Sequence, residues 1–222
     1  RRGRSGTAVL ERVPSALRPG VQSLLFQVLR ALGWAEAVRQ QLAPRAPAPA
    51  VDALLCTALA LLADEEHPPY APFTLVNQAV QAAKQDHATR AQAPFINACL
   101  RRFLRERGAL QQAVAGDLRA KWNHPLWWVA QLRKDHPQHW ERILQANNTQ
   151  APMVLRVNKQ KSTQAQYQQA LAAINLESMT VGDSGLVLQR AVPVQVLPGF
   201  ADGVVSVQDA AAQQAAPLLL AG

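Results

Sequence analysis

The chain has 222 residues, of which 49% are apolar and 17% charged, and its formal net charge is +8. That composition excludes disorder for most of the chain, and the longest nearly apolar run, residues 53–63, is too short for a membrane helix. Cys56 and Cys99 lie in apolar segments without metal-ligand spacing, which favours two reduced core thiols in a cytoplasmic protein over a disulfide or a catalytic pair.

Residues 1–147 predict an all-helical domain, because apolar side chains recur there at helical spacing. The three prolines in residues 43–50 predict a stiff loop, and Gly108 is expected to end a helix as a left-handed cap. The expected helices span about 19–42, 51–65, 73–86, 94–107, 109–120, 125–134 and 137–146.

The pattern changes after residue 148, where short segments have the composition of strands. We expect strands at 153–157, 177–181, 186–190 and 204–207, a helix at about 163–174, and a hairpin turn at 183–185. One helix and four short strands predict a small α+β domain of the split βαβ kind, ferredoxin- or RRM-like, at 151–207. A last helix, 209–220, is assigned with residues 208–222 to the start of a further domain.

The positive charge lies entirely in the first part of the chain. Residues 1–150 hold 19 Lys/Arg against 11 Asp/Glu, and within them residues 84–142 hold 11 against 5, whereas residues 151–222 hold 4 of each. A polyanion such as RNA is the obvious partner for a basic helical surface, although such charges also keep helices soluble. The side chains expected to contact phosphates are Lys84, Arg90, Arg101, Arg102, Arg105, Lys121 and Arg133.

No phosphate loop, zinc spacing or nucleophile motif is present, so the sequence predicts neither a complete active site nor a metal site. An aromatic side chain such as Trp122 or Trp128 could stack on an unpaired base, although a core position is the commoner fate of tryptophan in a short helix. Arg156 and Asn158 could face RNA or a neighbouring domain, and a structural role at a strand end is equally compatible.

Several motifs add a family resemblance. Residues 76–80 (Val-Asn-Gln-Ala-Val) and 95–102 (Phe-Ile-Asn-Ala-Cys-Leu-Arg-Arg) resemble the two-helix signature of NusB-type RNA-binding domains. Five further segments resemble, in order and spacing, bacterial 16S rRNA (cytosine-C5)-methyltransferases of the RsmB (Sun/Fmu) family. They are residues 123–128 (Asn-His-Pro-Leu-Trp-Trp), 146–148 (Ala-Asn-Asn), 152–158 (Pro-Met-Val-Leu-Arg-Val-Asn), 197–203 (Leu-Pro-Gly-Phe-Ala-Asp-Gly) and 205–209 (Val-Ser-Val-Gln-Asp).

The resemblance implies a NusB-like helical domain and a small α/β domain that together position 16S ribosomal RNA. The family's chemistry belongs to a third, Rossmann-like domain that binds S-adenosylmethionine and carries two catalytic cysteines. Cys56 and Cys99 do not match those positions, so we expect this chain to bind no cofactor and to be inactive alone, as a monomeric recognition part that lacks the catalytic domain and an N-terminal helix.

Two other interpretations remain open at this stage. The first is a stand-alone NusB-like RNA-binding factor, which residues 151–222 disfavour because such factors normally end with the helical domain. The second is a protein-interaction module whose basic face meets an acidic partner.

Overall fold

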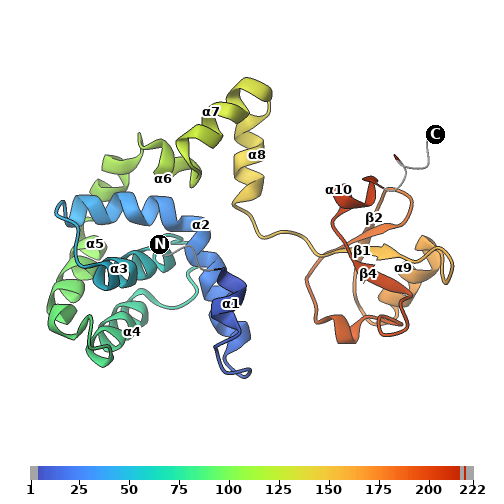
Figure 1. Cartoon of the computed structure of the whole chain (residues 1–222), viewed down its shortest axis with the longest axis horizontal. Coiled ribbons are helices and arrows are strands. Elements are labelled where there is room, and N and C mark those ends of the chain that lie inside the picture. The colour runs from blue at the N-terminus through green and yellow to red at the C-terminus, as the bar shows by residue number, and fades with distance from the viewer. Residues whose placement is uncertain (1–4, 216–217, 219–222) are drawn as a thin grey trace. The chain divides into compact units, whose positions relative to one another are not determined.

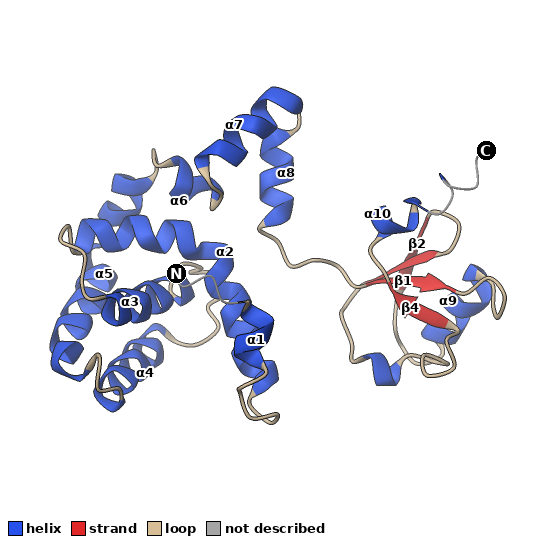
Figure 2. Ribbon diagram, viewed as in Figure 1, coloured by secondary structure: helices blue, strands red, loops and turns tan. Residues whose placement is uncertain are grey.

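A computed structural model, which describes residues 5–215 and 218, divides the chain into two compact units with the boundary between Thr149 and Gln150 (Figure 1). The first unit is helical, and the second combines a small sheet with short helices (Figure 2). No helix of the described residues is both long and apolar enough to cross a membrane. The fold class predicted from the sequence, mainly helical with a small α+β domain, is confirmed.

The helical unit is built around α3, whose side chains are apolar on most sides. Val51, Leu55 and Leu59 of α3 are fully buried, and α2, α4 and α5 pack against this helix. Trp122, Val129, Leu132 and Leu144 form a second, smaller core. The elements are α1 (Gly6–Leu10), α2 (Arg18–Leu42), α3 (Pro49–Leu61), α4 (Pro72–Gln85), the 3-10 turn η1 (Arg90–Gln92), α5 (Ala93–Val114), α6 (Leu118–Trp122), α7 (Leu126–Asp135) and α8 (Trp140–Asn147).

Helix α5 does not end at Gly108, where the sequence predicted a left-handed cap. Its backbone leaves helical geometry at Glu106 (φ −109°, ψ 18°), and the helix then continues to Val114. Gly108 has no positive φ. Leu110 and Val114 are buried, and the packing of these two side chains is a reason for the helix to continue beyond the glycine.

Three other elements differ from the prediction. The short helix α1 was not anticipated. The expected helix 109–120 is replaced by the end of α5 and by α6, which Asp117 caps by accepting from the backbone N–H of Arg119 at 2.7 Å. Helix α8 begins at Trp140 rather than near residue 137, because the chain first makes a turn closed by hydrogen bonds to the carbonyl of His136.

The second unit has a four-stranded sheet in the order β2-β3-β1-β4, and every pair of neighbours is antiparallel. Strands β1 and β2 therefore run in the same direction with β3 between them, which is the split βαβ arrangement. Thr163 and Gln166 form a capping box at the start of α9. The elements are β1 (Val154–Val157), α9 (Gln164–Ala172), β2 (Ser178–Val181), β3 (Gly185–Leu188), the 3-10 turn η2 (Val194–Val196), β4 (Val205–Val207) and α10 (Ala210–Gln213).

The two faces of this sheet differ. Leu155, Val157 and Leu186 are buried and pack with Leu171 of α9 in one core. Arg156 points to the opposite face, since side chains alternate along a strand. Of the helix expected over 209–220, the structure has α10 up to Gln213, and residues 216, 217 and 219–222 lie outside the described part.

Candidate nucleic-acid interface

Helix α5 carries two exposed arginines, Arg101 and Arg105, one helical turn apart. Within residues 5–215, neither forms an ion pair with a carboxylate. Arg102, by contrast, pairs with Glu106 at 2.9 Å between Nε and Oε2, which partly neutralises it. Of the three arginines predicted here, two keep their charge uncompensated on the surface.

A fourth arginine of the same sequence cluster, Arg107, has a structural role. Its Nη2 donates to the carbonyls of Leu62 (2.6 Å) and Ala63 (3.1 Å) at the end of α3, and its Nε pairs with Glu65. The guanidinium carbon lies 5.2 Å from the ring centroid of Phe103. Burial lowers the pKa of Arg107, and the nearby negative charge of Glu65 partly offsets this lowering. The Arg107 guanidinium is therefore bound to carbonyls at the C-terminus of α3, and it is not available to a ligand.

Lys84 and Arg90 are exposed where the chain passes from α4 into α5. The Nε of Arg90 donates to the backbone carbonyl of Lys84 at 3.1 Å, so the arginine lies against the last turn of α4. Helices α4 and α5 pack against each other. We call Lys84, Arg90, Arg101 and Arg105 the α4–α5 basic surface.

Lys121 and Arg133 each contact a tryptophan ring, and these two rings contact each other. Lys121 Nζ lies 4.6 Å from the ring centroid of Trp122, and the guanidinium carbon of Arg133 lies 4.8 Å from that of Trp140. The two tryptophan rings meet edge to face at 5.0 Å. Cation–π contacts of this kind hold both cations close to the aromatic core of α6–α8.

Trp122 itself cannot stack on a base, contrary to the expectation from sequence. Its side chain is only 4% exposed because it forms the centre of the smaller core with Trp140. Trp128 is half-buried against the same core. Trp127 is 70% exposed and lies 5.6 Å from Trp128 in an edge-to-face contact, so it is the tryptophan of this segment with a free ring face. Its position two residues before buried Val129, on the opposite side of α7, is the sequence signal that points to it.

Asn123 connects the segment α6–α8 to α2 through side-chain hydrogen bonds. Its side-chain Oδ1 accepts from the backbone N–H of Gly33 and its Nδ2 donates to the carbonyl of Leu29, both at 2.7 Å. The same Nδ2 also contacts Asn148 Oδ1 at 3.1 Å, and Asn148 Nδ2 donates to the Trp122 carbonyl at 2.8 Å. Asn123 ends α6 in the left-handed conformation with φ 56°.

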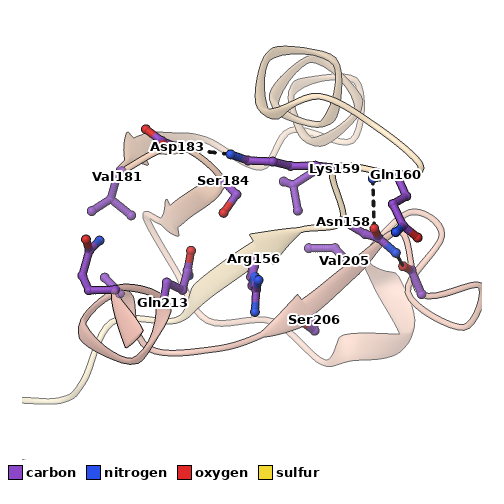
Figure 3. A pocket seen from close by; sticks show the side chains of 15 residues that line it. Arg156, Asn158, Lys159, Gln160, Val181, Asp183, Ser184, Val205, Ser206 and Gln213 are labelled. Carbon is purple, nitrogen blue, oxygen red and sulfur yellow. Dashed lines mark hydrogen bonds and ion pairs between the residues drawn. The ribbon is translucent and has the colours of Figure 1, made fainter. Parts of the chain in front are cut away.

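In the second unit, the end of β1 borders a groove of 870 Å³ (Figure 3). Arg156 lines this groove, and its Nη1 donates to Gln208 Oε1 at 3.2 Å. Asn158 also lines it, but Nδ2 donates to the Gly203 carbonyl and Oδ1 accepts from the Gln160 N–H, each at 3.1 Å. The Asn158 amide therefore closes a turn and ties β1 to the segment before β4.

The two cysteines have the environment of core thiols. Cys56 is 2% exposed, and burial, helped by the nearby charge of Asp52, raises its pKa to about 11. Burial also raises the pKa of Cys99. Both thiols are therefore protonated near neutral pH, which makes them poor nucleophiles. The described residues contain no cluster of His, Cys, Asp and Glu that could hold a metal ion.

Comparisons with known proteins point to one family. The family of RsmF/B-like methyltransferase ferredoxin-like domains matches residues 124–195. The ribosomal RNA small subunit methyltransferase B of Vibrio cholerae is 39% identical over 142 residues, which cover 63% of this chain and 32% of that protein. The enzyme of the same name from Pasteurella multocida is 35% identical over 207 residues, which cover 90% of this chain and 44% of that protein.

The chain thus spans less than half the length of the curated relatives it matches. Among solved structures, the crystal structure of PH0851 matches 89% of this chain and 45% of its own with a TM-score of 0.58. Its sequence identity is 15%, so this likeness concerns the fold alone.

Proposed function

Since this chain is a relative of the ribosomal RNA small subunit methyltransferase B proteins, we propose that it is the part of such an enzyme that binds ribosomal RNA. The observation that carries the proposal is the α4–α5 basic surface, where Arg101 and Arg105 remain unpaired while Arg102 and Arg107 bind carboxylates. Phosphate contacts of this type position a protein on RNA without reading its sequence. Lys121 and Arg133, held against their tryptophans, extend the set of cations in the same unit.

The finer proposal concerns the reaction of a full-length protein built like these relatives. It would be an S-adenosylmethionine-dependent methylation of C5 of a cytosine in 16S ribosomal RNA, in the cytoplasm, by a monomer. Such a reaction needs a thiolate that adds to C6, because C5 is not nucleophilic before that addition, and the target base must leave its stack. Cys56 and Cys99, protonated and buried, do not fit that role. The proposed task of this chain is substrate recognition.

The test is RNA binding by the whole chain with Arg101 and Arg105 replaced by alanine. Affinity for a fragment of 16S ribosomal RNA, measured by fluorescence anisotropy over a range of salt concentrations, should fall by about tenfold. The slope of log affinity against log salt should flatten by about 1.5, since each phosphate contact contributes about 0.7 to 0.9.

The matched control is the double variant Arg12→Ala, Arg45→Ala, which removes the same charge from exposed positions outside α4 and α5. It should bind as the unmodified chain does. Equal losses of RNA affinity in the two double variants would show that the effect comes from net charge alone, and this would contradict the proposal. Binding that excess heparin abolishes for every variant would favour the acidic-partner interpretation.

A further inference from the structure

The groove on the small unit is lined by the guanidinium group of Arg156, whose place on the sheet is set by the strand register. Arg156 is the direct cross-strand partner of Gly185 on β3 and of Ser206 on β4. Direct partners lie on the same face of a sheet, so the arginine rises between two of the smallest side chains. A Cβ on Gly185 would lie 2.7 Å from the Val181 carbonyl oxygen, so the glycine is required for the close approach of the chain at this point. The Gln213 side chain lies over Gly185, with its Oε1 3.0 Å from that Cβ position, and the exposed Arg156 side chain keeps guanidinium N–H groups beyond the one that donates to Gln208.

The charge of the groove is positive although the unit as a whole is balanced. Residues 151–222 hold four basic and four acidic side chains. Of these, the described lining of the groove includes two basic side chains, Arg156 and Lys159, and a single acidic one, Asp183. Lys159 Nζ lies 3.9 Å from Asp183 Oδ2, and these side chains are 64% and 90% exposed, so the pair is weak and screened by solvent (Figure 3). An anionic group in the groove would meet Arg156 on the sheet and Lys159 at the rim.

The remaining lining favours a sugar–phosphate chain over a base. Among the residues that the structure describes, no aromatic side chain lines the groove, whereas sheets that read bases in RNA do so with stacked aromatics. Hydroxyl and amide groups of Ser184, Ser206 and Gln160 also line the groove, and they suit ribose hydroxyls and phosphate oxygens. A volume of 870 Å³ is that of a small-ligand site, room for about one or two nucleotides and not for a duplex.

We infer that this groove binds the phosphodiester backbone of a single-stranded segment of RNA, with Arg156 and Lys159 contacting phosphates. This inference rests on the proposed function and extends it to a second surface, separate from the α4–α5 basic surface and indifferent to base identity. Gln208, which accepts from Arg156, and Gln213, which donates to the Leu155 and Gln208 carbonyls, hold the groove's wall in position.

The test uses the whole chain and a labelled oligouridylate of about ten nucleotides, within the size range of a single-strand site. Arg156→Ala should weaken binding about fivefold to tenfold and flatten the salt slope by about 0.7, the value for one single-strand phosphate contact. Ser206→Glu, which places a carboxylate beside Arg156, should weaken binding at least as much. Arg190→Ala, an exposed arginine outside the groove, should leave affinity within about twofold.

A second oligonucleotide with abasic sites at its centre separates backbone from base recognition. The loss caused by Arg156→Ala should be the same with this probe as with oligouridylate. A loss that disappears with the abasic probe would overturn backbone recognition, and unchanged affinity in both groove variants would overturn the site itself. If those variants bind normally while Arg101→Ala, Arg105→Ala weakens binding, the groove inference fails and the proposed function stands. If the unmodified chain binds no RNA, both fail.

Discussion

The side chain of Asn123 forms hydrogen bonds to one turn of α2, about ninety residues earlier in the chain. Leu29 C=O and Gly33 N–H are four residues apart, the spacing of hydrogen-bond partners in a helix, and Asn123 bonds to both. Its own backbone is left-handed, a conformation that asparagine tolerates better than most residues. One residue thus ends α6 and anchors the aromatic segment to the main bundle.

Replacing this residue should therefore destabilise the helical unit. Asn123→Ala should lower the free energy of unfolding by about 2 to 4 kcal/mol, since it removes the hydrogen bonds to α2 and since alanine tolerates the left-handed conformation less well than asparagine does. Asn123→Gly should recover about 1 kcal/mol of that loss, because glycine relieves the strain but restores no hydrogen bond. Chemical denaturation measures both. Asn147→Ala at an exposed position is the control, and a glycine variant as stable as the unmodified chain would contradict the anchoring role.

The site residues show which contacts composition can and cannot predict. Clustering of positive charge correctly pointed to an exposed surface at Arg101 and Arg105, because surface charge follows directly from helical periodicity. Arg107 was not among the predicted phosphate contacts, but its structural role could not be predicted either, because its partners Leu62 and Ala63 lie more than forty positions earlier. Trp122 was misplaced for the same reason, since its burial depends on contact with Trp140.

Between elements, α2 and α6 approach each other closely at Gly33. At Gly33 a Cβ would lie 2.4 Å from the backbone carbonyl oxygen of Arg119, so only glycine allows the two helices to meet there. Glycine in a helix interior normally costs stability relative to alanine. The packing gained between α2 and α6 offsets that cost.

Alanine at two helical glycines should therefore have opposite effects. Gly33→Ala should lower the free energy of unfolding by about 1 to 3 kcal/mol, because the clash is with backbone that cannot turn aside. Gly108→Ala, in α5 where an added Cβ would meet nothing within 4 Å, should raise it by about 0.5 to 1 kcal/mol. Thermal unfolding followed by circular dichroism compares them, and stabilisation in both would show that α6 can move away from α2.

Local signals predicted most elements to within a few residues. Pro19 correctly marked the start of α2, since proline fits the first turn of a helix, whereas α3 begins at Pro49, inside the segment predicted as a stiff loop. The composition of short segments after residue 148 correctly predicted the four strands of the sheet. The kink at Glu106 was missed because Gly108 carries the stronger local stop signal, while the burial of Leu110 and Val114 depends on distant helices.

At the scale of the whole molecule, the two units have separate cores. Leu100 belongs to the large core of the helical unit, and Leu186 to the core between the sheet and α9, and both are fully buried. Each core closes with side chains from its own side of the boundary after Thr149. The units should accordingly respond independently to a cavity.

Hydrogen exchange followed by mass spectrometry tests that independence. Leu186→Ala should speed amide exchange across residues 153–207 and leave residues 18–147 protected, because a cavity of this kind costs its own core about 2 to 5 kcal/mol. Leu100→Ala should give the reverse pattern. Faster exchange in both units from either substitution would show that they unfold as one.

The connection between the units sets how two weak RNA contacts would combine. Only residues 148–153 separate the end of α8 from the start of β1, a span of at most about 20 Å when fully extended. For an RNA strand long enough to reach both units, binding at the second unit after the first would be intramolecular, at an effective concentration on the order of millimolar for a short tether. Two contacts of modest individual affinity would then give a higher overall affinity, and lengthening this tether would weaken binding without changing either contact.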